Sequence, residues 1–289
     1  MNLKNKLILE EYRKEKASYE ALGEIVSGKI KKEIKSSGIM VLTVEHRVKT
    51  EASLAGKLEL KDEKYHFLSD ITDILGARVI CYFSDDVDKV TAFIQELFEV
   101  DWENSVDKRA QLNANAFGYL SVHFVCSLRP EEGVPPELTE KKFEIQIRST
   151  LQHIWAEIEH DLGYKSEFGV PRTIRREFSR VAGLLEIADE QFIGIRDGLH
   201  GYGADIRRKI AENCADDVPL DLVSLQEYMA HNRPMRAFLD ELSAICGAEI
   251  SDISPENYLH QLSWMGLNTL GDLSWLLEQN RELALKLAQ

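Results

Sequence analysis

The sequence predicts a protein that combines strands and helices in one domain, of the α/β or α+β class, and then continues as helices alone. Three observations predict this class. Strand-like and helix-like segments alternate from about residue 38 to residue 165. Apolar residues recur every three or four positions before and after that region. Finally, 44% of the 289 residues are hydrophobic, which is enough to fill a core.

Residues 1–36 are expected to form an N-terminal helical cover. Apolar residues with helical spacing predict one or two amphipathic helices: Leu7, Leu9, Tyr12, Tyr19, Leu22, Ile25 and Ile30. The segment lacks the apolar stretch and cleavage site of a secretory signal, and no run in the sequence approaches the ~20 apolar residues that span a bilayer. We therefore expect a cytoplasmic protein with no membrane partner.

The middle region, residues 37–213, contains the predicted sheet. Four segments have strand-like sequences, IMVLTVEHRVK, ARVICYF, GYLSVHFVCSL and KFEIQIR. The segments TEASLAGKLEL, SDDVDKVTAFIQELFE and STLQHIWAEIEHDLG have helical spacing and lie between or after them. A long helical pattern begins at Pro171, a residue that suits a helix start.

Residues 214–289 are expected to form a separate, acidic helical domain that follows the linker-like sequence ADDVPLD. From Asp216 to the end there are 12 acidic and 4 basic residues, so this part carries −8 of the net charge of −14. It has enough apolar residues for a core of its own. We expect it to regulate the protein or to assemble it as a homo-oligomer, and to take no part in chemistry.

Charge and cysteine content argue against two classes of protein. The net charge of −14 is unlike that of a general nucleic-acid binder, which usually carries a basic stripe. The four cysteines form no CxxC pair, so neither a zinc site nor a disulfide framework is indicated. We expect reduced and mostly buried thiols.

A cluster of cations is predicted where the first strand gives way to a helix. The segment carries Arg47, Lys49, Ser53 and Lys57, and the last two share a helix face because they are four residues apart. Lysines beside the free N–H groups of a helix N-terminus suit a polyphosphate. The alternative is an ordinary solvated helix face.

Polar residues also follow the later strands. Asp73 precedes the strand that opens with Arg78, where a Mg²⁺ ligand would be suitable, although the two residues could simply pair with each other. Glu144, Gln146 and Arg148 occupy alternate positions, so one face of that strand is polar. A second strand places Tyr119, Ser121 and His123 on one face, which could also reflect ordinary packing.

Five motifs occur in the order HRVKTEASLAGKL, DILGARV, GYLSVHF, FEIQIRS and AEIEHDLGYKS. Together they resemble the synthetase domain of the RelA/SpoT family, in particular the stand-alone small alarmone synthetases, over roughly residues 20–200. The resemblance implies an α+β fold with a mixed, nucleotidyltransferase-like β-sheet flanked by helices; the C-terminal helical extension lies outside it. It also implies transfer of a pyrophosphoryl group from ATP to the 3′-hydroxyl of GDP or GTP, which makes guanosine tetra- or pentaphosphate.

The resemblance implies a role for each matching residue on the donor side. Arg47 and Arg78 would sandwich the adenine of ATP. The phosphates of ATP would be held by Lys49, Ser53 and Lys57.

For the acceptor side and the metal, the resemblance implies Mg²⁺ as cofactor, with Asp73 and Glu144 as ligands. Glu144 could instead take the proton from the 3′-hydroxyl. Tyr119 would stack on the guanine of the acceptor. The other acceptor-binding residues would be His123, Gln146, Arg148 and Lys165.

Several alternatives stay open. Leu120 stands where many relatives have arginine, so the preference between GDP and GTP is not predicted. A toxin-type relative that pyrophosphorylates the 3′ end of tRNA would need basic surface, which the lysine-rich leader or the sequence PRTIRREFSR could supply. A non-catalytic nucleotide-sensing module is disfavoured because both carboxylates are present. For His160, which precedes Asp161, we expect a structural or substrate-side role in preference to metal binding.

Overall fold

The computed structural model describes residues 2–61, 64–107, 121–130, 134–163, 171–247 and 255–289. It divides into two compact units, residues 1–193 and residues 194–289. The dividing point lies inside one long helix, whereas the sequence predicts a boundary after residue 213. The predicted three-part domain division stays a prediction.

The first unit is built on a mixed sheet in the described residues. Its strands are β1 (Val41–Val48), β2 (Leu75–Cys81), β3 (Phe98–Asp107), β4 (Val122–Leu128) and β5 (Phe143–Ser149). They lie in the order β1-β2-β5-β4-β3, with β2 and β5 parallel and the other neighbours antiparallel. The predicted α+β fold with a mixed sheet is confirmed.

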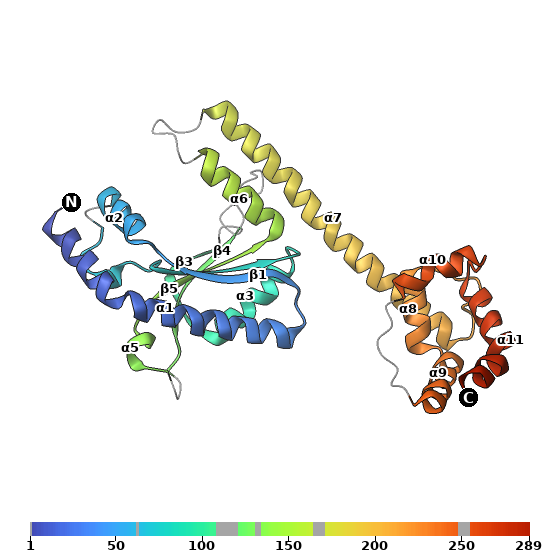
Figure 1. Ribbon diagram of the computed structural model, residues 1–289. Coiled ribbons are helices and arrows are strands. Elements are labelled where there is room, and N and C mark those ends of the chain that lie inside the picture. The colour runs from blue at the N-terminus through green and yellow to red at the C-terminus, as the bar shows by residue number, and fades with distance from the viewer. Residues whose placement is uncertain (1, 62–63, 108–120, 131–133, 164–170, 248–254) are drawn as a thin grey trace. The chain divides into compact units, whose positions relative to one another are not determined.

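Helices cover the two faces of this sheet differently (Figure 1). One face carries α1 and α3 and the other carries α6. The helices and short turns of the first unit are α1 (Leu3–Ser37), α2 (Glu51–Leu60), η1 (Leu68–Asp70), α3 (Asp86–Leu97), α5 (Pro136–Thr139), α6 (Thr150–Gly163) and the first half of α7 (Arg172–Ala211).

The N-terminal cover is a single helix, α1, which packs on β1 and β2. Asn2 caps its start, because the Asn2 side chain accepts a hydrogen bond from the Asn5 N–H, and Gly38 ends it with a positive φ of 70°. Gly23 permits the close approach, since a Cβ there would lie 2.3 Å from Cδ2 of His46 on β1. Leu7, one of the residues expected on the apolar face of this helix, is exposed, so the prediction is wrong for this residue.

The alternation along the strands separates a core face from a polar face. On β5, Phe143, Ile145 and Ile147 are fully buried in the main core. Glu144 and Gln146 point to the opposite face, the one that α6 partly covers. The sheet therefore presents polar side chains beneath α6.

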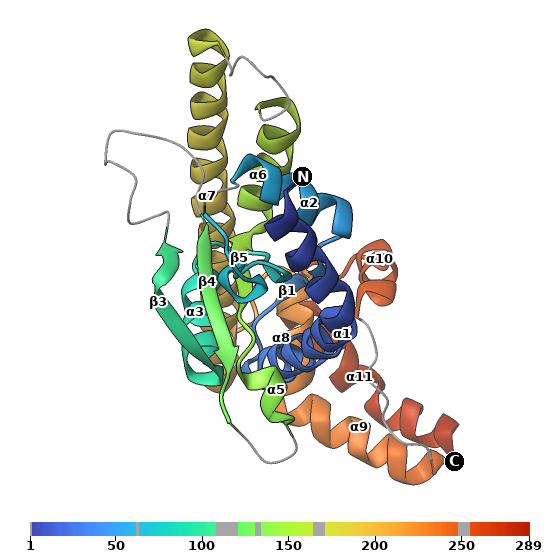
Figure 2. The same cartoon turned by 90° about the vertical axis from the view of Figure 1, so that its left-hand side faces the viewer.

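The second unit has its own core, as the sequence predicts. Helices α8 (Leu222–His231), α9 (Arg233–Cys246), α10 (Glu256–Trp264) and α11 (Leu270–Ala288) follow α7. Figure 2 labels these four helices after α7. Leu225, Tyr228, Leu270 and Leu273 are buried together with Ile206 from the end of α7. The last turns of α7 thus belong to the core of the acidic helical unit.

Two smaller expectations have different outcomes. None of the helices in the described ranges is long and apolar enough to cross a membrane. All four cysteines are free, but only Cys81 and Cys126 are buried, so the expectation of mostly buried thiols fails for Cys214 and Cys246.

Candidate active site

The register of three strands brings the predicted polar residues into rows across the sheet. Glu144 on β5 lies beside Gly76 on β2, and Gly76 lies beside Arg47 on β1. In the next row, Gln146 lies beside Arg78. Residues that are almost one hundred positions apart in the sequence therefore share one surface.

A cationic cluster forms where β1 ends. Nζ of Lys57 lies 2.6 Å from Oδ1 of Asp73, and Nζ of Lys49 lies 3.2 Å from Oδ2 of the same carboxylate. Burial acts to lower the pKa of Lys57, but the hydrogen bond and charge of Asp73 outweigh it and raise that pKa. Two cations share one anion, so the cluster keeps a net positive charge for a phosphate.

Hydrogen bonds fix the backbone at Lys49 and at the start of α2, the helix that carries Lys57. The Lys49 N–H donates to the Ile74 carbonyl at 2.8 Å, and the hydroxyl of Tyr12 on α1 donates to the Lys49 carbonyl. Thr50 caps α2, because its hydroxyl oxygen accepts a hydrogen bond from the Ser53 N–H. Ser53 is exposed in the first turn of α2, one turn before Lys57 on the same face.

Glu144 is a half-buried carboxylate with close polar neighbours. Its Oε1 lies 3.1 Å from Nδ1 of His123 and accepts a hydrogen bond from the amide of Gln146. Burial alone would raise the pKa of Glu144. The hydrogen bonds and charge of His123, the amide of Gln146 and the charge of Lys57 together lower that pKa to about 2.

Arg148 supports this carboxylate indirectly. Its Nη2 donates to Oε1 of Gln146 at 2.6 Å, and Gln146 in turn donates to Glu144. The Arg148 side chain is buried. Arg148 therefore fixes the orientation of the Gln146 amide.

The other end of the polar surface is organised around Arg78. Its Nη1 lies 3.2 Å from Oε1 of Glu157 on α6 and 3.8 Å from Oε1 of Glu45 on β1. The alternative in which Arg78 merely pairs with Asp73 is not seen, because Asp73 engages the lysines.

One cavity of about 220 Å³ joins these groups. Six of the predicted site residues line it, namely Arg47, Lys49, Asp73, Arg78, Glu144 and Gln146. Lys57 contacts the lining residue Asp73, and His123 contacts the lining residue Glu144. Ser53 lies nearby on α2, but it is not among the lining residues in the described part of the chain.

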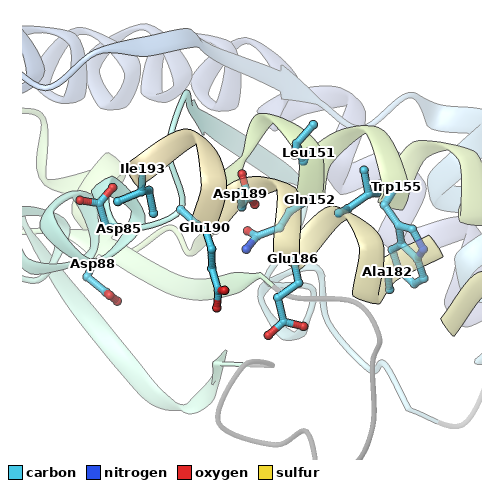
Figure 3. Close-up of a pocket in the computed structure, with 12 residues that line it drawn as sticks. Asp85, Asp88, Leu151, Gln152, Trp155, Ala182, Glu186, Asp189, Glu190 and Ile193 are labelled. Carbon is cyan, nitrogen blue, oxygen red and sulfur yellow. The ribbon is translucent and has the colours of Figure 1, made fainter. Parts of the chain in front are cut away.

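A larger cavity of about 380 Å³ lies elsewhere in the same unit, between α3, α6 and the first half of α7 (Figure 3). Its carboxylates are Asp85, Asp88, Glu186, Asp189 and Glu190. The described residues that line it include no lysine, arginine or histidine. An acidic cavity is unsuited to a polyphosphate, so charge and not size identifies the nucleotide cleft.

Two predicted acceptor residues, Tyr119 and Lys165, lie outside the described residues.

The pair His160 and Asp161 is exposed on α6, with side chains 68% accessible. Within the described ranges, no group of three or more His, Cys, Asp or Glu side chains could hold a metal ion.

The sequence did not indicate Glu45, which lines the cleft, or Glu157, which pairs with Arg78 from outside the lining. Glu45 lies on the same strand face as Arg47, and Glu157 belongs to a helix that returns over the sheet. The alternation of Glu45 with Arg47 is a signal that could have found the first. The second depends on the packing of α6, which no local pattern predicts.

The residues present fit a magnesium ion of the kind that bridges protein and phosphate. Mg²⁺ takes one or two carboxylates and completes its shell with water and phosphate oxygens. Asp73 and Glu144 line one cavity, and Gly76 lies beside Glu144 in the sheet. A Cβ on Gly76 would meet no described atom within 4 Å, so the position beside Glu144 on this face of the sheet is open.

Comparisons with known proteins agree with this geometry. Residues 46–168 match the family model described as a region found in RelA / SpoT proteins. GTP pyrophosphokinase YjbM of Bacillus subtilis (strain 168) is 32% identical over 169 residues, which cover 57% of this chain and 77% of that protein.

Comparison with solved structures indicates the same family. Small alarmone synthetase 1 from Bacillus subtilis matches with a TM-score of 0.55 and 25% identity, over 66% of this chain and 99% of that chain. The same synthetase bound to its product pppGpp matches with a TM-score of 0.53 and 25% identity, over 66% and 99% of the two chains. The family predicted from the five motifs is confirmed, and this chain belongs to the RelA/SpoT family.

Proposed function

We propose that this protein transfers a pyrophosphoryl group from ATP to the 3′-hydroxyl of GDP or GTP and so makes guanosine tetra- or pentaphosphate. One observation carries the proposal. A single cavity joins a cluster of cations around Asp73, two arginines at its other end, and the ionised Glu144. The names of the relatives, a GTP pyrophosphokinase and an alarmone synthetase, support the same reaction.

In this proposal the donor nucleotide lies along the cavity. Lys49, Lys57 and Ser53 bind its phosphates, where the positive end of α2 adds to the lysine charges. Arg47 and Arg78 hold its base from two neighbouring strands, because a planar guanidinium can stack on a purine.

Glu144 is proposed to act at the reacting end. With a pKa of about 2 it is ionised at neutral pH and is a weak proton acceptor. Of its two predicted roles, the low pKa favours holding the metal over storing the proton. Mg²⁺, when bound by Asp73 and Glu144, would neutralise charge on the phosphates.

The acceptor nucleotide is proposed to bind beside β4 and β5. His123, Gln146 and Arg148 lie there, and Gln146 and Arg148 act through the orientation of Glu144. Tyr119 and Lys165 keep their proposed roles in stacking on guanine and binding the acceptor.

The test is incubation of the purified protein with radiolabelled ATP and GDP, GTP or bulk tRNA. Transfer to GDP or GTP supports the proposal. Transfer only to the 3′ end of tRNA would favour the toxin-type alternative, for which Arg172, Arg175 and Arg176 at the exposed start of α7 offer basic surface. The cytoplasmic location and a homo-oligomeric state stay predictions.

A further inference from the structure

The base end of the cleft contains a carboxylate that the proposed chemistry does not use. Glu45 lines the cavity, lies beside Arg78 across the β1–β2 pair, and is two residues before Arg47 on the same strand face. It is thus a direct neighbour of both arginines, across the strand pair for Arg78 and along β1 for Arg47. Its side chain is 54% exposed, so a ligand can reach it.

Glu45 keeps its capacity to accept hydrogen bonds. Oε1 of Glu157 lies 3.2 Å from Nη1 of Arg78, whereas Oε1 of Glu45 lies 3.8 Å from the same atom, which is longer than a hydrogen bond. Glu157 comes from α6 and is not among the described residues that line the cavity. Glu157 therefore positions the guanidinium, and Glu45 faces the space next to it.

The two ends of the cleft differ in what they can recognise. Lys49 and Lys57 gather around Asp73 at the phosphate end. At the other end, the arginines can stack on a base, but stacking tolerates any purine because every base has a π face. Discrimination between purines must come from a group at the edge of the base.

We propose that Glu45 selects adenine as the base of the donor nucleotide. This inference rests on the proposed function. Its carboxylate accepts a hydrogen bond from the exocyclic 6-amino group of adenine. Guanine carries a carbonyl oxygen at that position, so two acceptors would face each other without a proton between them.

Such a residue answers a problem that the reaction itself creates. The acceptor is a guanine nucleotide, and GTP carries the same triphosphate as ATP. Lysines at the phosphate end cannot tell the two apart. A site that hydrogen-bonds one base discriminates against an analogue with the wrong group more strongly than an apolar site does, because the analogue brings two acceptors together.

The leaving group makes the choice of donor measurable. In each turnover the 3′ oxygen bonds to the β-phosphorus of the donor, the bridging bond between α- and β-phosphates breaks, and the hydroxyl proton is released. The donor leaves as its monophosphate. AMP therefore reports ATP as donor, and GMP reports GTP as donor.

The experiment compares wild type with Glu45→Gln at fixed GDP, and measures kcat/KM for AMP release from ATP and for GMP release from GTP. ITP is a further donor, since its base has the carbonyl of guanine without the 2-amino group. A glutamine amide can donate to a carbonyl oxygen as well as accept from an amine. We expect the preference for ATP over GTP and over ITP to fall by about tenfold.

Two control variants separate selection from positioning. Glu159→Gln changes the same group on α6 outside the cleft and should leave the preference as in wild type. Glu157→Gln should raise KM for both donors together, because it loosens Arg78 without touching the base edge.

The outcomes are distinct from those of the proposed function. A preference within twofold of wild type in a Glu45→Gln protein that still releases AMP overturns the role of Glu45 and leaves the proposed function standing. If the variant is folded by circular dichroism but inactive, the ratio of Kd values for nonhydrolysable ATP and GTP analogues decides in the same way. A wild-type protein that releases no AMP with any acceptor overturns both.

Discussion

At the scale of single residues, the cleft is a set of charges that hold one another in place. Asp73 fixes two lysines, and His123 and Gln146 fix Glu144. Most of these residues were predictable, because polar residues at alternate positions of a strand lie on the same face of the sheet. Their partners were not, since the pairing of His123 with Glu144 depends on the register of two strands.

The first prediction concerns Glu144→Gln. The change keeps the volume of the side chain and removes the charge that metal and substrate require. Transfer should be abolished while ATP binding stays close to that of wild type, as measured by turnover assay and by titration calorimetry. Turnover above about a tenth of the wild-type rate would remove Glu144 from the catalytic residues.

The pKa of Glu144 also predicts how stability depends on pH. The pKa is lowered in the folded protein, from 4.5 to about 2, so the interactions of the carboxylate stabilise the fold above pH 4.5 and are lost as the pH falls toward 2. The difference in free energy of unfolding between wild type and Glu144→Gln should therefore change between pH 4.5 and 2. Urea unfolding at several pH values measures it, and a difference that does not change over that window contradicts the assigned environment.

At the scale of elements, most strands and helices that have a buried face were predictable, including the edge strand β1, but the edge strand β3 was not. β3 is an edge strand that pairs only with β4 in the described sheet, and its register shifts between Asp101 and Val106. Its sequence, FEVDWENSVD, alternates only weakly because much of it faces solvent. Loss of alternation at the edge explains why this strand was missed.

The close packing of α1 on β1 leads to a stability prediction that has a matched control. Gly23→Ala would place a Cβ 2.3 Å from Cδ2 of His46, next to Arg47. We expect a loss of stability of about 1–3 kcal/mol. Gly28→Ala lies on the same helix and meets no described atom within 4 Å, so its gain in helix propensity should stabilise the protein by about 0.5–1 kcal/mol.

Urea unfolding compares the two alanine variants directly. Equal and small effects of Gly23→Ala and Gly28→Ala would show that α1 does not need its close approach to β1.

At the scale of the whole molecule, the chain joins a nucleotide-binding unit to an acidic helical one. Every described residue of the charged cavity belongs to residues 1–193. The acidic composition of the tail and its apolar content were evident in the sequence, but its use of Ile206 and Ile210 from α7 was not. A helical pattern shows which face is apolar and not which core that face joins.

This division predicts the effect of truncation. A chain that ends after Ile193 should fold and keep transferase activity, and light scattering measures whether its oligomeric state changes. A chain that ends after Asn213 leaves Ile206 and Ile210 without their core and should be more prone to aggregate. If the shorter chain is folded by circular dichroism but inactive with every acceptor, the tail contributes to the active site.

The most direct test of the central claim is a transfer assay with ATP labelled at the β-phosphate, Mg²⁺, and either GDP or GTP. The account predicts that the label appears in guanosine tetra- or pentaphosphate in an amount equal to the AMP released, and that Glu144→Gln removes both products. Label that stays in ATP with GDP and with GTP, in a protein that is folded and binds ATP, would contradict the account.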